Sequence, residues 1–215
     1  MPLSWNQWDH TTWEKAWSYR RHFDLPEDAT GRIFLDFEAA NVTATVTLNG
    51  QRLGRHFGGC LPFSFEITDV VKPTGNVLAV LVDARFNINV PPNMPAPAHS
   101  EEVDYWQPGG IYGTATLRAV PNTYITDVAA TPRDTLDDAK GRVEITCFID
   151  AASAASSAHV DVVIEDLAGN AVASASSADT ALAAGENEVP LVVDGITSIE
   201  LWDVDSPTLC NCSGA

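Results

Sequence analysis

The chain has 215 residues, which is long enough to bury a substantial core without disulfide or metal staples. Hydrophobic residues make up 45% and charged residues 19%, a composition typical of a folded domain rather than a disordered chain. The 12 Lys and Arg against 29 Asp and Glu give a net charge of −17, which argues against nucleic acid and anionic lipid surfaces as partners.

Alternation of apolar and polar residues dominates the first half of the chain. At residues 33–37 every second residue is apolar and turned to one face, which predicts a strand with one buried side. Residues 44–48 alternate apolar side chains with threonine, and the Asn49-Gly50 dipeptide that follows suits the positive φ angles of a type I′ turn. Residues 44–53 are therefore predicted to form a hairpin. Residues 77–82 are apolar at every position and indicate a central strand.

A second set of short strands is predicted after Pro121. Apolar residues alternate with more polar ones over residues 143–149 and 160–164. Residues 167–170, Leu-Ala-Gly-Asn, look like the turn that closes a hairpin. A last candidate strand covers residues 199–202. Turn signals about every 8–12 residues suit a sandwich of short antiparallel strands.

The fold class predicted from these patterns is all β, because no stretch shows a convincing apolar stripe of period 3.6. We interpret the Ala- and Ser-rich stretches 151–158 and 171–184 as strand ends and loops rather than as helix or linker. The aromatic-rich half gives way to an aromatic-poor half near Asn122, so we expect two β-sandwich domains, residues 1–121 and 122–215. Four of the 6 tryptophans fall within the first seventeen positions, which indicates that this segment packs down as well.

Membrane, export and metal signals are all lacking. The longest aliphatic run, residues 77–82, is far shorter than the ~18 apolar residues of a membrane span, so no membrane partner is expected. Residues 1–8 lack a basic stretch followed by an apolar core, so no secretory signal is expected, and the location stays open. The cysteines Cys60, Cys147, Cys210 and Cys212 form no metal-ligand spacing. We expect reduced thiols in or near a core, no metal and no cofactor.

Residues 100–112 hold the densest cluster of side chains suited to chemistry, with carboxylates, aromatic rings and a Pro-Gly-Gly turn. A carboxylate such as that of Asp104 can accept hydrogen bonds from two adjacent hydroxyls, and an indole such as that of Trp106 suits the C–H face of a pyranose. Sugar recognition fits this chemistry. A solvated acidic loop, with Trp106 filling the edge of the sandwich, fits the composition as well.

Glu102 and Asp104 do not make a convincing catalytic pair. Residues two apart on a strand are separated by roughly 6.5 Å, which approaches the carboxylate spacing of inverting glycosidases. Both side chains would project in the same direction from one segment, however, whereas such catalysts approach the glycosidic bond from opposite sides. The five histidines show no metal spacing, no GxSxG motif occurs, and no catalytic residue is assigned.

Several short motifs occur along the chain in a fixed order, and together they cover nearly its whole length. They are Tyr19-Arg20-Arg21-His22-Phe23-Asp24-Leu25-Pro26, Arg32-Ile33-Phe34-Leu35-Asp36-Phe37, Leu48-Asn49-Gly50, Gly58-Gly59-Cys60-Leu61-Pro62-Phe63, Gly75-Asn76, the block from Asp104 to Tyr112, Leu201-Trp202 and Ser206-Pro207-Thr208-Leu209-Cys210. This series resembles the amino-terminal portion of glycoside hydrolase family 2, the family of β-galactosidases, β-glucuronidases and β-mannosidases.

The resemblance implies a division of labour. It implies a jelly-roll sugar-binding domain over residues 1–121 and an immunoglobulin-like sandwich over residues 122–215, followed in the family by a (β/α)8 barrel that carries both catalytic glutamates. No counterpart of these glutamates is expected here, so the chain alone is expected to be inactive. Counting six positions back from Gly110, the resemblance implies that Asp104 contacts sugar hydroxyls in the barrel's active site, and that Trp106 lines the same edge.

The chain also departs from the family pattern. Gly113 stands where the family usually has arginine, and Cys60 and Cys210 stand where tyrosine is common. The tail from Asn211 to Ala215 replaces the expected last strand, so we expect a sandwich that lacks it, with an open edge available for a homo-oligomer. These features suggest a fragment, an interrupted reading frame or half of a split enzyme.

Three functions therefore stay open on the sequence. The first is the non-catalytic front of a family 2 exo-glycosidase, whose partner would be a catalytic barrel of the same or a companion chain. The second is a stand-alone carbohydrate-binding module, and the third is a structural or interaction sandwich without a sugar role. Because an exposed carboxylate competes with water for sugar hydroxyls, carbohydrate binding by the chain alone is expected to be weak.

Overall fold

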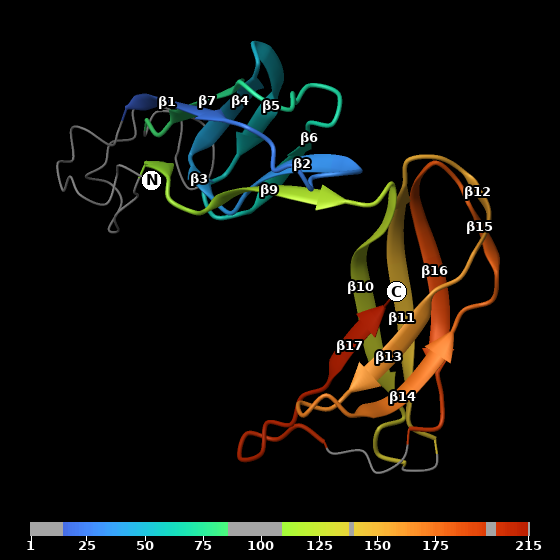
Figure 1. Ribbon diagram of the computed structural model, residues 1–215. Helices are drawn as coiled ribbons and strands as arrows, with labels where there is room; N and C mark the ends of the chain where they lie inside the picture. The colour runs from blue at the N-terminus through green and yellow to red at the C-terminus, as the bar shows by residue number, and fades with distance from the viewer. Residues whose placement is uncertain (1–14, 86–108, 138–139, 197–200, 215) are drawn as a thin grey trace. The chain divides into compact units, whose positions relative to one another are not determined.

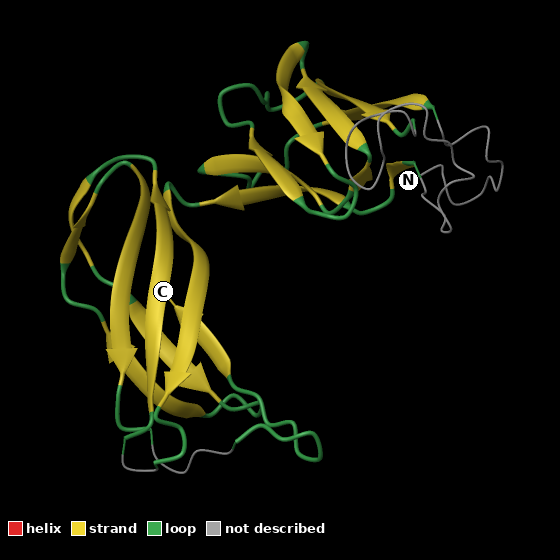
Figure 2. Ribbon diagram, turned by 180° about the vertical axis from the view of Figure 1, so that it is seen from behind, coloured by secondary structure: helices red, strands yellow, loops and turns green. Residues whose placement is uncertain are grey.

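The computed structural model describes residues 15–85, 109–137, 140–196 and 201–214. The chain divides into two compact units, Met1–Val120 and Pro121–Ala215, which we call the first and the second unit. Every regular element of the described residues is a β-strand, and none is a helix (Figures 1 and 2). The predicted all-β class is thus confirmed. Among the described residues, no helix has the length and apolarity that crossing a membrane requires.

The first unit is built from two main antiparallel sheets. One has the strand order β1 (Ala16–Phe23), β7 (Asn76–Asp83), β4 (Thr43–Leu48) and β5 (Gln51–Phe57). The other has the order β6 (Phe63–Glu66), β2 (Arg32–Phe37) and β9 (Ala115–Val120). A short third ladder pairs β3 (Ala40–Asn41) with β8 (Gly110–Ile111).

Period-two alternation explains how these sheets bury a core. In β2 the side chains of Ile33, Leu35 and Phe37 are at most 5% exposed, as the alternation predicts. They pack with inward residues of the other sheet, including Leu48 and Val80. Strand β7 pairs with β1 on one side and with β4 on the other, so the predicted central position of residues 77–82 is confirmed.

The predicted hairpin is also confirmed. Strands β4 and β5 pair directly across Asn49 and Gly50, whose φ angles of 52° and 85° are those of a type I′ turn. The Asn49 side chain reinforces the turn, because its Oδ1 accepts a hydrogen bond from the backbone N–H of Val77 at 2.9 Å. The turn is therefore tied to the neighbouring strand as well as to its own hairpin.

The second unit is again made of antiparallel sheets. One has the order β10 (Thr123–Arg133), β11 (Arg142–Ala151) and β16 (Gly185–Val193). Another has the order β14 (Ala171–Ser176), β13 (Asp161–Glu165) and β17 (Asn211–Gly214). A short pair joins β12 (Ala155–Ala158) to β15 (Thr180–Leu182). Ile145, Val162 and Val193 lie in the core between these sheets.

The predicted turn at residues 167–170 joins β13 to β14, and Gly169 takes the positive φ of 83° that the turn needs. The Ala- and Ser-rich stretches are part of the sandwich and not helix, as expected, but they form the complete strands β12, β14 and β15, so their interpretation as strand ends and loops is wrong. Two further expectations differ from the structure. Leu201 and Trp202 lie in irregular chain rather than in a strand, while residues 199 and 200 lie outside the described residues. By contrast, the sequence predicts that the tail replaces the last strand of the sandwich, but its residues Asn211–Gly214 form β17, which pairs with β13.

The cysteines follow their prediction only in part. All four are free thiols, but only Cys147 is buried, in the core of the second unit, where burial raises the pKa of its thiol. Cys60, Cys210 and Cys212 are exposed, so the expected position in or near a core is wrong for these three. Cys60 lies in an irregular loop and the other two in or next to an edge strand, where no apolar partner covers them fully.

Candidate functional site at the corner formed by β3 and β8

The two residues predicted to contact sugar, Asp104 and Trp106, lie outside the described residues, as does Glu102. The structure does describe the chain on either side of the segment 86–108 that carries them. Its first flank is the end of β7, and its second flank is β8. The position of these two flanks therefore defines where a site built on this segment is anchored.

The first flank is held next to β3. The backbone N–H of Val42 donates to the carbonyl of Asp83 at 3.3 Å, at the end of β7. The next residue, Ala84, donates its N–H to the carbonyl of Lys15 at 3.2 Å. The Arg85 guanidinium donates from Nε to the Asp83 carboxylate at 2.9 Å and holds the pKa of that carboxyl below its usual range. The chain is thus fixed up to the point where the segment begins.

The second flank returns to the same place. Gly110 and Ile111 of β8 pair with Asn41 and Ala40 of β3. Beyond β8 the N–H of Gly113 donates to the carbonyl of Ala39 at 3.3 Å. Both flanks are therefore bonded to one short stretch of chain, residues 39–42. We call the surrounding group of residues, 38–42, 58–60, 83 and 110–114, the β3–β8 corner.

Glu38 fixes the far side of this corner. Its backbone N–H donates to the carbonyl of Thr114 at 3.0 Å, and its carboxylate Oε2 accepts from the N–H of Thr114 at 2.7 Å. The bond from the Thr114 N–H lowers the pKa of the Glu38 carboxyl. Gly113 also has to be small, because a Cβ there would stand 2.6 Å from the Ala39 nitrogen and 2.6 Å from the Glu38 Cβ. The departure from arginine at position 113 of the family pattern therefore coincides with a close backbone contact.

Asn41 is the buried polar residue of the corner, with only 5% of its surface exposed. Its side-chain oxygen lies against Gly59, where an added Cβ would come within 2.1 Å of Oδ1. The neighbouring Gly58 has a φ of 105° and donates its N–H to the carbonyl of Val42 at 2.9 Å. Gly58 and Gly59 thus allow a turn and a close backbone approach, as glycine is expected to do. No role for Asn41 is predicted from the sequence, although a polar residue within the small and largely apolar stretch 39–44 is a signal.

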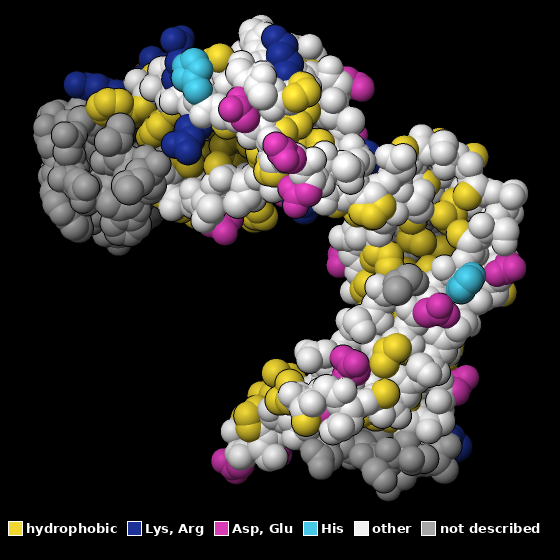
Figure 3. All heavy atoms as spheres, viewed as in Figure 1, with side chains coloured by type: hydrophobic (Ala, Val, Ile, Leu, Met, Phe, Trp, Pro, Cys, Tyr) yellow, Lys and Arg dark blue, Asp and Glu magenta, His cyan; other side chains and the backbone are white. Residues whose placement is uncertain are grey.

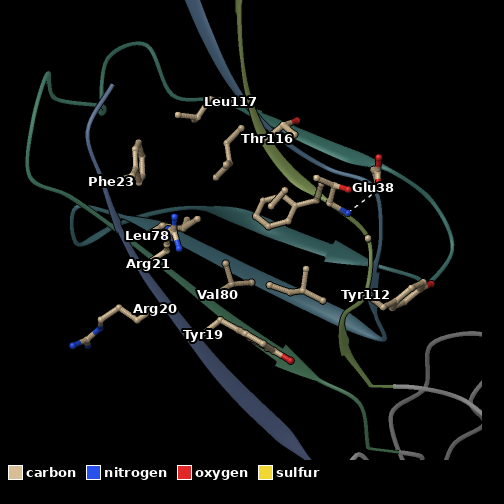
Figure 4. Close-up of a pocket in the computed structure, with 16 residues that line it drawn as sticks. Tyr19, Arg20, Arg21, Phe23, Glu38, Leu78, Val80, Tyr112, Thr116 and Leu117 are labelled. Carbon is tan, nitrogen blue, oxygen red and sulfur yellow. Dashed lines mark hydrogen bonds between the residues drawn. The ribbon is translucent and has the colours of Figure 1, made fainter. Parts of the chain in front are cut away.

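Tyr112 closes the corner from the other side. Its hydroxyl donates a hydrogen bond to the carbonyl of Gly59 and lies 3.8 Å from the Cys60 Sγ. Burial and then the neighbouring Cys60 thiol raise the pKa of Tyr112 to about 12, so the phenol stays neutral and keeps donating at any physiological pH. This bond attaches the loop 58–60 to the chain that follows β8. Figure 4 shows Tyr112 and Glu38 next to this chain, and its dashed line marks the bond that the Glu38 carboxylate accepts from the Thr114 N–H.

The corner offers hydrogen-bonding groups rather than a reactive set. It holds an amide, a phenol and backbone groups, and its carboxylates are already bonded to Arg85 or to Thr114. In the part of the chain that the structure describes, no cluster of three or more His, Cys, Asp or Glu side chains is suited to hold a metal ion. The corner is therefore suited to hold a recognition loop in place.

Comparison with known proteins assigns the chain to a family. The family model described as "Glycosyl hydrolase 2 galactose-binding domain-like" matches residues 3–127. The chain belongs to glycoside hydrolase family 2. The match covers the first unit, including the whole β3–β8 corner and the segment 86–108.

Individual relatives of this family 2 chain are named as β-galactosidases and β-glucuronidases. A β-galactosidase of Thermoanaerobacter pseudethanolicus is 36% identical over 134 residues, which cover 61% of this chain and 17% of the relative. A β-galactosidase of Thermoanaerobacterium thermosulfurigenes is 27% identical over 210 residues, 96% of this chain and 28% of the relative. The crystal structure of a Bacteroides uniformis β-glucuronidase matches with a TM-score of 0.76 and 26% identity, over 93% of this chain and 24% of that one.

The chain thus spans less than a third of the length of each of these relatives. The structural match over 93% of the chain confirms that this family 2 member has the β-sandwich architecture of the non-catalytic amino-terminal part of such enzymes.

Proposed function

We propose that the chain forms the sugar-contacting rim of a family 2 exo-glycosidase that removes a terminal β-galactoside or β-glucuronide residue. In this proposal the proton donor and the nucleophile belong to a catalytic barrel of the same or a companion chain. The observation that carries it is the attachment of both flanks of segment 86–108 to residues 39–42. The names of the relatives support the substrate class.

A rigid attachment matters because a sugar-binding loop works by position. Binding residues are often placed on loops that a rigid scaffold holds, since ordering a free loop on binding would cost affinity. At the β3–β8 corner, three backbone hydrogen bonds, the pairing of β3 with β8 and the Tyr112 hydroxyl hold the two flanks. In the proposed role Asp104 accepts hydrogen bonds from neighbouring sugar hydroxyls, and Trp106 covers an apolar face of the ring.

A chimeric enzyme tests this role. This chain would replace the matched part of the Thermoanaerobacterium thermosulfurigenes β-galactosidase, with which it aligns over 210 residues. If the chimera hydrolyses a chromogenic β-galactoside, Asp104→Ala is expected to lower kcat/KM by roughly 10- to 100-fold, the range for one lost hydrogen bond to a charged group. The matched control Asp69→Ala removes an exposed carboxylate outside the corner and should change kcat/KM less than twofold. Equal effects of the two substitutions would contradict the role of Asp104.

The isolated chain separates this role from an independent binding module. Chromogenic β-galactoside, β-glucuronide and β-mannoside are all expected to stay at the background rate. Titration calorimetry with oligosaccharides should show no saturable binding tighter than roughly 0.1 mM, about 5.5 kcal/mol. Tighter binding would support the carbohydrate-binding module instead. Hydrolysis that Asp104→Ala abolishes would contradict the proposal that the catalytic groups lie elsewhere.

A further inference from the structure

The first unit has an apolar groove between its two main sheets, on the side where β1 and β9 form the sheet edges. The groove has a volume of about 820 Å³. Its walls are mostly apolar side chains. They include Leu35, Leu78 and Val80 of the core, Phe23, which packs against that core, and the exposed Leu117. Figure 3 shows the hollow on this face with yellow side chains at its floor, and Figure 4 shows it at close range. The space is large enough for several residues, and Leu35 and Val80 at its floor are at most 3% exposed.

Both long walls of the groove are edges of sheets. Within the described ranges, β1 pairs only with β7, and β9 pairs only with β2. The second edge of each strand therefore has no strand paired to it within these ranges. Such edges bind other extended chains readily, because a further strand satisfies the N–H and C=O groups of an edge in a row. An apolar ligand of compact shape would fill the volume but would leave both edges unpaired.

At one end of the groove the Tyr19 hydroxyl is hydrogen-bonded to the backbone of Ile111, which links β1 to β8. Phe23 and Leu117 lie at the other end of the groove (Figure 4). From Tyr19 to Phe23 the wall extends over four residue steps, about 13 Å at the rise of a strand. This length suits an extended segment of about five to seven residues.

Arg21 gives the groove a charge preference. In the register of β1 with β7, Tyr19 lies opposite Val80 and Arg21 opposite Leu78, so both side chains share the inward face with these core residues. Figure 4 shows Arg21 beside Leu78 in the groove. Arg21 has no ion pair with any described residue. The Arg21 guanidinium, at an inward position of an edge strand, can therefore bind an anionic group next to the apolar wall.

From these contacts we infer that the groove between β1 and β9 binds an extended polypeptide segment by strand addition. The segment has apolar side chains at alternate positions and an acidic side chain that meets Arg21. The occupant is a strand of a separate protein with this chemistry. Its binding adds a partner that the sugar-contacting role does not include. Backbone hydrogen bonds to a free edge supply the affinity, the apolar side chains complete the core, and Arg21 selects the charge.

Two synthetic heptapeptides test the inference with the full chain. Both alternate valine and threonine, and one inward valine is replaced by glutamate in the first peptide and by lysine in the second. Fluorescence anisotropy of the labelled peptides gives their dissociation constants. The glutamate peptide is expected to bind at least tenfold more tightly than the lysine peptide. Amide hydrogen exchange should then slow in β1 or β9 and nowhere else in the described chain.

Variants of two arginines make the test specific. Arg21→Glu is expected to reverse the preference in favour of the lysine peptide, and Arg21→Ala to abolish it. Arg52→Glu is the matched control and should leave the preference unchanged, because Arg52 of β5 is exposed and does not line the groove. Both positions are exposed, so these variants should fold, which their amide spectra would verify.

Several results would overturn the inference. One is that neither peptide binds at millimolar concentration. Another is that Arg21→Glu leaves the preference unchanged, or that protection appears at another edge such as β17. If β1 and β9 were already protected in a dimer of the chain without peptide, the occupant would be a second copy and the inference would be wrong. None of these results depends on sugar hydrolysis, so the proposed enzymatic role would remain unaffected.

Discussion

At the scale of single residues, Asn76 connects three segments of the first unit while fully buried. Its Oδ1 accepts from the backbone N–H of Lys72 at 2.8 Å and from the Asn49 Nδ2 at 3.0 Å. Its Nδ2 donates to the carbonyl of Lys72 at 2.6 Å. An alanine in its place would leave the part-buried N–H and carbonyl of Lys72 without these bonds, and each unsatisfied group costs about 1–3 kcal/mol.

We therefore predict that Asn76→Ala lowers the free energy of unfolding of the first unit by about 2–4 kcal/mol. Urea unfolding, followed through amide signals of this unit, would measure the change. Ser64→Ala is the matched control in the same unit, because it removes one exposed hydrogen bond to Asp36 and should cost less than about 1 kcal/mol. A loss for Asn76→Ala no larger than that of the control would show that the network adds little.

Tyr112 provides a second prediction at this scale. Its folded-state pKa of about 12 lies above the ordinary value of 10.0, so the neutral phenol is favoured by folding. The stability that it contributes is fully present below about pH 10 and is lost as the pH rises toward 12. A difference titration of tyrosinate absorbance between the chain and Tyr112→Phe should show this group titrating near pH 12.

The Cys60 thiol is the second cause of this shift, after burial. Cys60→Ala is accordingly predicted to bring the pKa of Tyr112 down while leaving it above 10, because burial of the phenol remains. The same difference titration measures it. If Cys60→Ala left the midpoint near 12, the contact between the thiol and the hydroxyl would have no electrostatic role.

At the scale of elements, β5 contacts β6 through a glycine, which has no side chain. Gly54 of β5 lies under the Phe65 ring, and an added Cβ would stand 2.4 Å from Cε1 of that ring. Gly54→Ala is predicted to cost about 1–3 kcal/mol in urea unfolding, because the ring has to move within a packed core. The double variant Gly54→Ala with Phe65→Leu should recover part of that loss, giving a coupling energy above about 0.5 kcal/mol. Strict additivity would argue against the contact.

The same scale shows what the sequence predicts well. Residues 44–53 form their hairpin because the Asn-Gly turn and the threonine alternation favour the same register, and residues 77–82 are central because they are apolar throughout. Residues 199–202 show the limit. The sequence Ile-Glu-Leu-Trp at these positions has strand-like composition, yet Leu201 and Trp202 lie exposed in irregular chain. Local composition cannot tell a strand from an apolar loop when the partner strand is set by distant chain.

The candidate site was less accessible to sequence reasoning than the fold. Strands β3 and β8 have two residues each, too few for any periodicity, and they bring Asn41 beside Gly110 from positions 69 residues apart. Tyr112 and the glycines at 58 and 59 were noticed as motif members, but their mutual contact depends on that long-range pairing. The roles of Asp104 and Trp106 remain predictions, because both lie outside the described residues.

At the scale of the whole molecule, the negative charge is unevenly divided. The second unit has 16 acidic and 3 basic side chains, a net charge of −13, whereas the first has 13 acidic and 9 basic, a net charge of −4. Within the second unit, Asp150 of β11 lies directly opposite Glu186 of β16. Like charges directly opposite on neighbouring strands destabilise a sheet. Its described ion pairs, such as Arg133 with Glu144, are exposed and contribute little.

Salt should therefore stabilise the second unit more than the first. The screening length falls from about 30 Å at 0.01 M salt to about 10 Å at 0.1 M, which weakens repulsion among the many carboxylates. We expect a gain on the order of 1 kcal/mol, which would raise the melting temperature of a domain of this size by roughly 4–8 °C. Thermal unfolding followed through amide signals of each unit would measure it. Glu186→Gln should reproduce part of the gain at low salt, whereas Glu27→Gln in the first unit should not. A second unit that salt leaves unchanged or weakens would show that its ion pairs outweigh the repulsion.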